Sequence, residues 1–332
     1  MSVCVEIPKK PRSPSRRPSL NPRPYEYHES VLLAETVERL VPAPGKVVVD
    51  GTLGGGGHTA ALLAAGAQVI GFDQDPEALA FAGRKLAEFG DRFRPVHTSF
   101  AKATEALDQL SVEKIDGALL DLGVSSRQLD APERGFSFMR DGPLDMRMDP
   151  TNLISAADLV NTMAGDQLEK IFRNYGEEPS ARKIAAHLVR ERLVAPFRTT
   201  LQLAQAVERV IPRHGRTHPA TRVFQALRIA VNRELEALSL GLEQLSQRLA
   251  PGGRFAIITF HSLEDRIVKV FFKERVAEFI DRPEWPEPRP NPIHIFKAIT
   301  GKPVVASDAE QRANPRSRSA KLRVVERIPH VH

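Results

Sequence analysis

A glycine-packed turn after the first clear strand constrains this chain more than any other segment. The apolar run 47–49 is typical of a buried strand in a parallel sheet, and the alanine-rich stretch 59–65 is typical of the helix that follows. The glycines of 51–57 allow positive φ angles and a close approach of the backbone to a ligand. Free N–H groups at the helix start would face that ligand. This unit predicts a nucleotide-type cofactor site.

The next strand and the glycine spacing narrow the choice of cofactor. A strand at 68–73 ends in Asp73, at about the spacing of roughly 20 residues where such folds bind a ribose diol. The dinucleotide pattern beginning at Gly54 would need a glycine where Thr59 stands, and no Gly-Lys-Ser/Thr follows for a phosphate loop. The looser glycine loop of S-adenosylmethionine (SAM) enzymes remains.

Strands and helices alternate through the first part of the chain, which predicts an α/β fold with a doubly wound parallel sheet. Further strands are expected at 93–100 and 115–121, with helices at 77–89 and 101–110 between them. Sheet-like patterning returns later, with a long helix at 221–249 and strands at 254–260, 294–300 and 321–325.

The segment between these two parts lacks convincing strands. Residues 130–220 carry a loop rich in Gly, Phe, Met and Asp followed by amphipathic helices. We therefore expect a catalytic domain built from 25–129 and 221–332, with an inserted helical substrate-recognition domain at 130–220. Residues 1–24, rich in Pro, Ser and Arg, are expected to be a disordered basic tail.

Positive charge is concentrated in particular segments rather than spread evenly. The net charge is +5 over 1–24, +9 over 182–233 and +5 over 312–327, within a chain total of +6. Such clusters suggest a polyanion partner, and 182–233 is the expected face that binds it. A basic helical face without a partner is the alternative. The tail could hold nucleic acid, act as a solubilising leader or be a transit peptide. The residues expected to bind RNA are Arg190, Arg192, Arg213 and Arg216.

Composition limits the classes of protein to which the chain can belong. Cys4 is the only cysteine, which excludes an internal disulfide and a cysteine zinc site, and no metal site is expected. No apolar stretch approaches the roughly 20 residues of a membrane span, and the chain starts without the apolar core of a signal peptide. We expect a cytoplasmic protein that is a monomer or a homodimer.

Several long motifs resemble one known family. They are Asp50–His58, Asp121–Ser126, Arg134–Asp149, His218–Glu234, Phe260–Arg266 and Asn314–Arg323. Together they make the chain similar to the RsmH (MraW) family over about 25–327. The resemblance implies a Rossmann-like class I methyltransferase sheet with an inserted helical domain. It also implies methyl transfer from SAM to N4 of a cytidine in the decoding region of 16S ribosomal RNA, possibly within the small ribosomal subunit. The SAM-binding positions that it implies are Gly56, Gly57, His58, Asp73, Phe100, Asp121 and Gln128.

The chemistry of N4 methylation selects candidates for catalysis. The N4 lone pair is delocalised into the ring, so the enzyme must place the amine in line and accept hydrogen bonds from N4–H. Asp121, at the end of the fourth strand, is the first candidate and Asp145, in the loop entering the insertion, the second. His261 follows the fifth strand and is a third. The base-stacking residue stays open among Phe136, Phe138 and His261.

Two rival functions are compatible with parts of the pattern. A ribosome-assembly factor could bind RNA and keep a vestigial SAM fold, although the intact glycine loop and Asp73 disfavour this. A NAD-dependent oxidoreductase is disfavoured by the failed dinucleotide pattern. Measured SAM binding would separate the first rival from an enzyme.

Overall fold

The computed structural model describes residues 30–213, 215 and 218–329. The tail expected at 1–24 and Arg216 lie outside the described residues. Within these ranges, no helix combines the length and the apolar character needed to cross a membrane.

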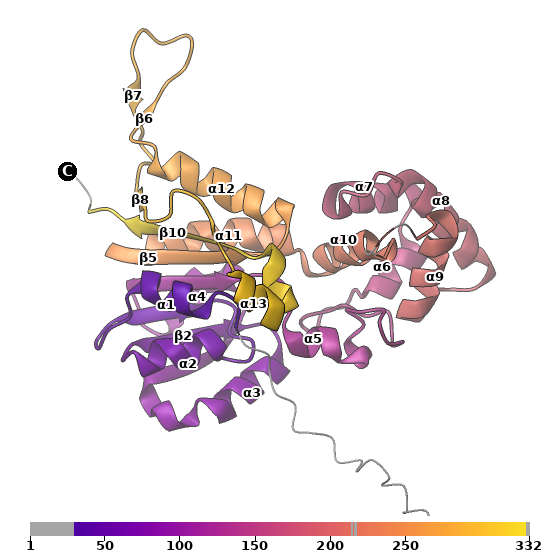
Figure 1. Ribbon diagram of the computed structural model, residues 1–332, viewed down its shortest axis with the longest axis horizontal. Coiled ribbons are helices and arrows are strands. Elements are labelled where there is room, and N and C mark those ends of the chain that lie inside the picture. Colours follow the sequence, from indigo (N-terminus) through magenta and orange to yellow (C-terminus); the bar gives the residue numbers. More distant parts are fainter. Residues whose placement is uncertain (1–29, 214, 216–217, 330–332) are drawn as a thin grey trace, which may run out of the picture.

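An eight-stranded sheet forms one half of the molecule (Figure 1). Its main strands are β1 (Val47–Asp50), β2 (Gln68–Asp73), β3 (Phe93–His97), β4 (Ile115–Asp121), β5 (Leu249–Thr259), β8 (Phe296–Ala298) and β10 (Lys321–Arg327). They are ordered β3-β2-β1-β4-β5-β10-β8, and β9 (Val304–Val305) also pairs with β10. Strands β1 to β5 run parallel, whereas β10 is antiparallel to β5. The expected doubly wound α/β sheet is confirmed, with an antiparallel strand beyond β5.

Helices cover both faces of the sheet. On one face lie α1 (Leu33–Leu40), α2 (Gly57–Ala64) and α3 (Pro76–Lys85). On the other lie α4 (Ala103–Gln109), α11 (Glu234–Arg248) and α12 (Ser262–Val276). Neighbouring strand residues alternate between the two cores, as Val48 and Val49 do. Because both faces of the central strand β1 are covered, it is apolar up to Asp50, which ends it.

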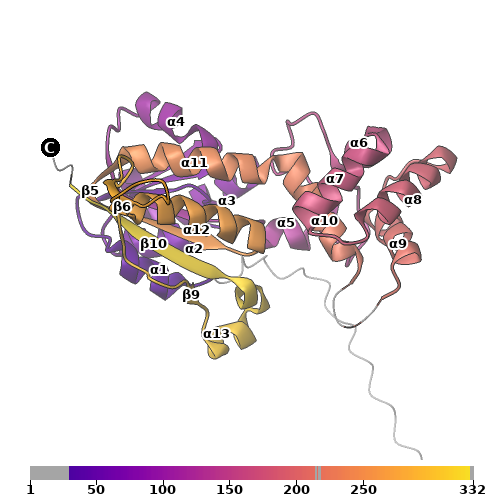
Figure 2. The same cartoon turned by 90° about the horizontal axis from the view of Figure 1, so that it is seen from above.

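Five helices form a second unit with its own apolar core, which we call the helical unit. They are α6 (Ala156–Thr162), α7 (Gly165–Gly176), α8 (Ala181–Val194), α9 (Thr200–Val210) and α10 (Ala220–Asn232). The short helix α5 (Ser126–Asp130) and a loop at 134–149 lead into it. Figures 1 and 2 show this unit beside the sheet, with α10 and α11 running from one to the other.

The prediction of one long helix at 221–249 is wrong in one respect, because this segment forms two helices. Arg233 adopts a left-handed conformation with φ 50° and ends α10, and α11 begins at Glu234. Buried side chains of α10 belong to the helical core, whereas those of α11 belong to the sheet core. On this packing we propose that the inserted unit extends to Asn232. Local sequence could not show the break, since no proline or glycine marks it.

The remaining elements are short. Strand β3 ends at His97 rather than at 100, because the Ser99 side chain accepts from the Ala101 N–H and starts a 3₁₀ turn at Phe100–Lys102. Other 3₁₀ turns span Ala87–Arg92, Pro132–Arg134 and Pro315–Ser319. Helix α13 is Asp308–Ala313, and β6 (Phe279–Ile280) and β7 (Arg289–Pro290) form a hairpin that projects from the body.

Candidate active site

A cavity of about 410 Å³ opens at the carboxyl ends of the parallel strands. This is where open α/β sheets bind their ligands. Its wall combines the glycine loop, Asp73, the end of β4, and residues from the helical unit such as Arg228. Other lining residues include Gly57, His58, Phe100, Asp121, Gln128, Met148, Asn232, Phe260, Glu264 and Arg316. The cavity therefore lies between the two halves of the molecule.

The glycine loop takes the shape that its sequence predicts. Gly54 and Gly56 have positive φ angles of 50° and 68°. A Cβ on Gly57 would lie 2.0 Å from the Ser30 Oγ, so a side chain there would force the Ser30 hydroxyl to move. A Cβ on Gly56 would instead approach Leu86 at 3.0 Å, and Gly56 does not line the cavity. Gly56 thus shapes the turn, and Gly57 forms the wall.

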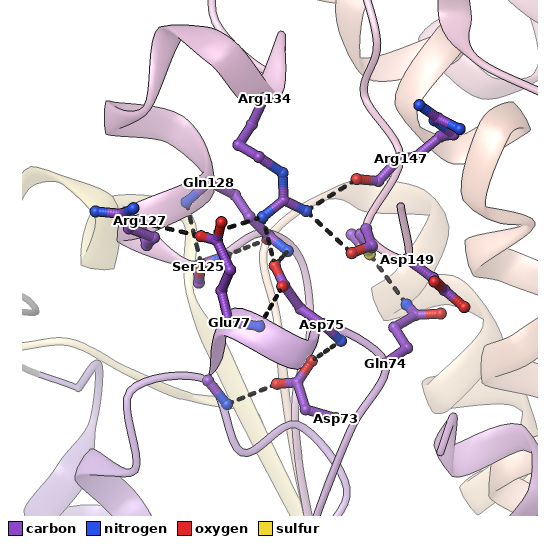
Figure 3. A network of polar contacts seen from close by, with 12 residues as sticks. Asp73, Gln74, Asp75, Glu77, Ser125, Arg127, Gln128, Arg134, Arg147 and Asp149 are labelled. Carbon is purple, nitrogen blue, oxygen red and sulfur yellow. Dashed lines mark hydrogen bonds and ion pairs between the residues drawn. The ribbon is translucent and has the colours of Figure 1, made fainter. Parts of the chain in front are cut away.

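Asp73 holds the loop from the end of β2. Its Oδ2 accepts from the Gly54 N–H at 2.8 Å, and its Oδ1 accepts from the Asp75 N–H at 2.9 Å (Figure 3). Burial raises the pKa of Asp73 to about 6. Carboxylate oxygens have further lone pairs, so Asp73 can still accept from a ribose diol.

A buried ion pair joins the sheet to the loop that leads into the helical unit. The Arg134 Nη1 donates to the Asp75 Oδ2 at 2.7 Å, and Nη2 donates to the carbonyls of Arg147 and Met148 (Figure 3). The Gln128 Nε2 donates to the same Asp75 oxygen at 3.0 Å, while its Oε1 accepts from the Ser125 N–H. Gln128 lines the cavity in a fixed orientation.

Asp121 is the most unusual carboxylate of the site. Its backbone N–H donates to the Thr52 Oγ1 at 2.6 Å. Its buried Oδ1 has no hydrogen-bond partner among the residues that the structure describes. Burial and then the negative charges of Asp50 and Glu264 raise its pKa well above the ordinary value. A buried acceptor in a cavity is available to a ligand that donates a hydrogen bond.

His58 lies beside Asp121 and is neutral. Its Nε2 lies 3.1 Å from the carbonyl oxygen of Val31, so Nε2 carries the proton. Its Nδ1 lies 3.6 Å from the Asp121 Oδ2. Burial lowers the pKa of His58 to about 4. A neutral histidine leaves the carboxylate without a cationic partner there.

His261 and Glu264 begin α12. His261 is the N-cap of that helix, and its Nε2 lies 3.0 Å from the Glu264 Oε1. Glu264 also accepts from the Phe260 N–H at 2.8 Å. Glu264 lines the cavity, whereas His261 does not. This places His261 behind the wall, in contact with a residue that forms it.

Asp145 lies away from the cavity. It binds Arg147 through two contacts, Nε to Oδ1 at 2.8 Å and Nη2 to Oδ2 at 2.7 Å, and it is not among the lining residues. The pair stabilises the loop that enters the helical unit. Its two acceptor oxygens are therefore engaged.

The arginines expected to bind RNA differ in their surroundings. Arg190 and Arg213 are exposed. Arg192 is half-buried, and its Nη1 donates to the carbonyls of Val160 at 2.8 Å and Met163 at 2.7 Å, at the end of α6. Arg192 thus stabilises the helical unit itself.

Sequence reasoning did not single out several residues of the wall. Arg228 and Glu234 form a bidentate pair across the α10–α11 break, with contacts of 2.9 and 2.8 Å. Asn232 accepts from the Met148 N–H and donates to the Met146 carbonyl, which holds the entering loop. The only sequence signal for a role of Arg228, Asn232 and Glu234 was their place in the motif 218–234. Glu234, His261 and Glu264 each offer one potential metal ligand, and these three atoms lie within 4.8 Å of one another. The positive charge of Arg228, which is paired with Glu234, disfavours a metal cation at this position.

The residues present fit SAM. The glycine loop gives the cavity a wall that the cofactor can approach closely. The Asp73 carboxylate can accept hydrogen bonds from the ribose. The unsatisfied oxygen of Asp121 can accept from a donor near the reacting methyl group. The β3-β2-β1-β4-β5 order with an antiparallel strand beyond it completes the pattern. The fold and the site together define a class I SAM-dependent methyltransferase.

Comparisons with known proteins narrow this class to a family. Residues 26–328 match the model of the MraW methylase family. A relative from Citrifermentans bemidjiense, named ribosomal RNA small subunit methyltransferase H, is 52% identical over 308 residues, covering 91% of this chain and 99% of the relative. A relative of the same name from Geobacter sulfurreducens is 50% identical over 307 residues, with 91% and 99% covered. The chain belongs to the MraW methylase family.

Replacing Asp73 with Ala should weaken SAM binding by about 1.5–3 kcal/mol, because a charged acceptor is lost. The ionised carboxylate is the stronger acceptor. Since the pKa of Asp73 is raised to about 6, wild-type affinity should also fall as the pH is lowered through that value, and the variant should lack this dependence. Titration calorimetry at several pH values checks both. An unchanged affinity in the folded variant contradicts the assignment.

Proposed function

We propose that this enzyme transfers the methyl group of SAM to N4 of a cytidine in the decoding region of 16S ribosomal RNA. The names of its relatives support ribosomal RNA of the small subunit as the substrate. The observation that carries the choice of an amine is the unsatisfied Asp121 oxygen at the end of β4. An exocyclic amine offers the N–H that such an oxygen needs.

Different residues of the chain would bind the cofactor and orient the target amine in this reaction. SAM, when bound, supplies an electrophilic methyl group. The glycine loop and Asp73 would hold the cofactor. Asp121 would accept a hydrogen bond from N4–H, which orients the amine and stabilises the positive charge that develops on it. The loop held by Asn232 and Arg134 contributes Met148 to the wall of the cavity.

The helical unit supplies the proposed RNA-binding surface. Exposed cations on it can pair with phosphates and offset the cost of presenting an unpaired or flipped cytidine, a few kcal/mol. We propose Arg190 and Arg213 for this role. Arg192 is better explained by its bonds to the end of α6.

Nucleoside mass spectrometry of ribosomal RNA, from cells with and without the protein, tests the proposed function. N4-methylated cytidine that depends on the protein supports it. Methylation of a different base or atom contradicts the proposed chemistry. SAM binding without any methyl transfer to RNA or to small subunits would favour the rival, an assembly factor with a vestigial cofactor fold.

Replacing Arg190 and Arg213 together with Gln should weaken RNA binding and flatten its salt dependence. Loss of two phosphate contacts to a single strand should reduce the slope of log K against log salt by about 1.4. Exposed Arg94 and Lys269 on the sheet half, replaced in the same way, serve as the matched control. A full slope in the first variant, or equal losses of slope in both variants, would place the RNA on another surface. SAM affinity should stay unchanged in both.

A further inference from the structure

The three residues expected to stack on the target base make other contacts in the structure. Phe136 is buried in the helical core at 6% exposure. Phe138 packs on His218 and Phe224, with ring centroids 4.6 and 4.7 Å apart. His261 caps α12. None of the three lines the cavity among the residues described, so an aromatic face for the base must come from a different position.

Phe260 is an aromatic residue of the cavity wall beside the Asp121 loop. It directly follows β5, is partly exposed and lines the same cavity as Asp121. A Cβ built on Gly123 would lie 3.7 Å from the Phe260 Cδ2, so the two residues face each other. Gly123 has a φ of 96°, which other residues rarely adopt, and it places no side chain beside the ring.

The Phe260 backbone is held in place, so its ring is presented from a rigid support. Its N–H donates to the buried Glu264 carboxylate at 2.8 Å, which ties it to the first turn of α12. Phe100, the other lining phenylalanine, is different. A Cβ on Gly241 of α11 would lie 2.4 Å from the Phe100 Cδ2, so that ring is pressed against α11. The Phe100 Cβ lies against Gly51 of the glycine loop.

We propose that Phe260 stacks on the target base while Asp121 accepts from its amine, an inference that rests on the proposed function. A ring face beside the acceptor would fix the plane of the base and bring the N4 atom toward Asp121. Leu122, Gly123 and Val124 follow Asp121, so no aromatic residue directly follows β4. The ring comes instead from the end of the neighbouring strand β5.

Two substitutions at Phe260 separate stacking from packing. Phe260→Leu keeps an apolar side chain but removes the π face, whereas Phe260→Tyr keeps the face. Loss of a base–aromatic stack of about 1–3 kcal/mol corresponds to about a 5- to 140-fold loss of kcat/KM for RNA. We expect that loss in the Leu variant, near-wild-type values in the Tyr variant, and unchanged SAM affinity by calorimetry in both. Phe279→Leu, at an exposed position on the β6–β7 hairpin, is the matched control and should behave as wild type.

Two other outcomes at Phe260 would overturn the stacking proposal. Wild-type kcat/KM in Phe260→Leu means that the ring does not contact the base. Equal losses in the Leu and Tyr variants, or a parallel loss of SAM affinity, assign the ring to packing or to the cofactor. The methylated nucleoside made by the wild-type enzyme is identified in the same assay. If it is not N4-methylcytidine, the proposed function fails, whereas the Leu–Tyr comparison still judges the stacking.

Discussion

Replacing Asp121 with Asn is expected to lower the single-turnover rate of methyl transfer about 100-fold or more at saturating SAM. This is the usual scale for a positioned proton acceptor. Asn has nearly the same shape but no charge, so packing around the Thr52 contact should survive. The loss follows because the unsatisfied Oδ1 is the acceptor available to an incoming amine. SAM affinity, measured by calorimetry, should change far less than the rate.

The rate should also depend on pH through Asp121. Burial and the charges of Asp50 and Glu264 raise its pKa well above the ordinary value. The ionised carboxylate is the effective acceptor, so the rate should rise as the pH rises through the raised pKa and level off above it. The Asn variant should lack this limb of the profile.

Asp145→Asn is the matched control for Asp121→Asn. The Asp145 carboxylate is occupied by Arg147 outside the cavity, so its loss should leave the single-turnover rate near that of wild type. The assignment is contradicted by a wild-type rate in Asp121→Asn, or by equal losses in both variants. Glu264 would then be the next carboxylate to test, because it also lines the cavity.

Replacing Arg134 with Met should destabilise the fold by about 3–5 kcal/mol, the usual cost of leaving a buried charge without its partner. The Asp75 side chain is only 3% exposed, and Arg134 is its cationic partner. Arg134 also holds the carbonyls of 147 and 148, so the entering loop loses its attachment to the sheet half. Urea denaturation followed by circular dichroism measures the change.

Two further variants test the cause of that loss. Arg147→Met breaks a pair whose side chains are 25% and 27% exposed, and should cost no more than about 1 kcal/mol. Asp75→Asn combined with Arg134→Met removes the orphaned charge and keeps an acceptor for the Glu77 N–H at the start of α3. The double variant should recover part of the stability. Equal losses for Arg134→Met and Arg147→Met would contradict a buried ion pair at this position.

The features that depend on neighbouring residues in the chain could be predicted from local sequence patterns. The β1–loop–α2 unit, the carboxylate ending β2, the alternation of strands and helices, and the acidic residue ending β4 follow from local patterns of apolar, glycine and acidic residues. Because parallel strands share one carboxyl edge, Asp73 and Asp121 had to lie at the same end of the sheet, and both line the cavity.

The contacts of each polar side chain, in contrast, depend on how the elements pack together. Asp121 and Asp145 are equivalent as residue types, yet the Oδ1 of Asp121 has no partner among the described residues, whereas Asp145 is bound to Arg147. Arg192 differs from Arg190 because α6 ends beside it, and α10 joins the helical core because its apolar face meets α7. These outcomes depend on partners distant in the sequence. Hydrogen bonding and burial at such positions are set by the packing of whole elements, which residue spacing does not encode.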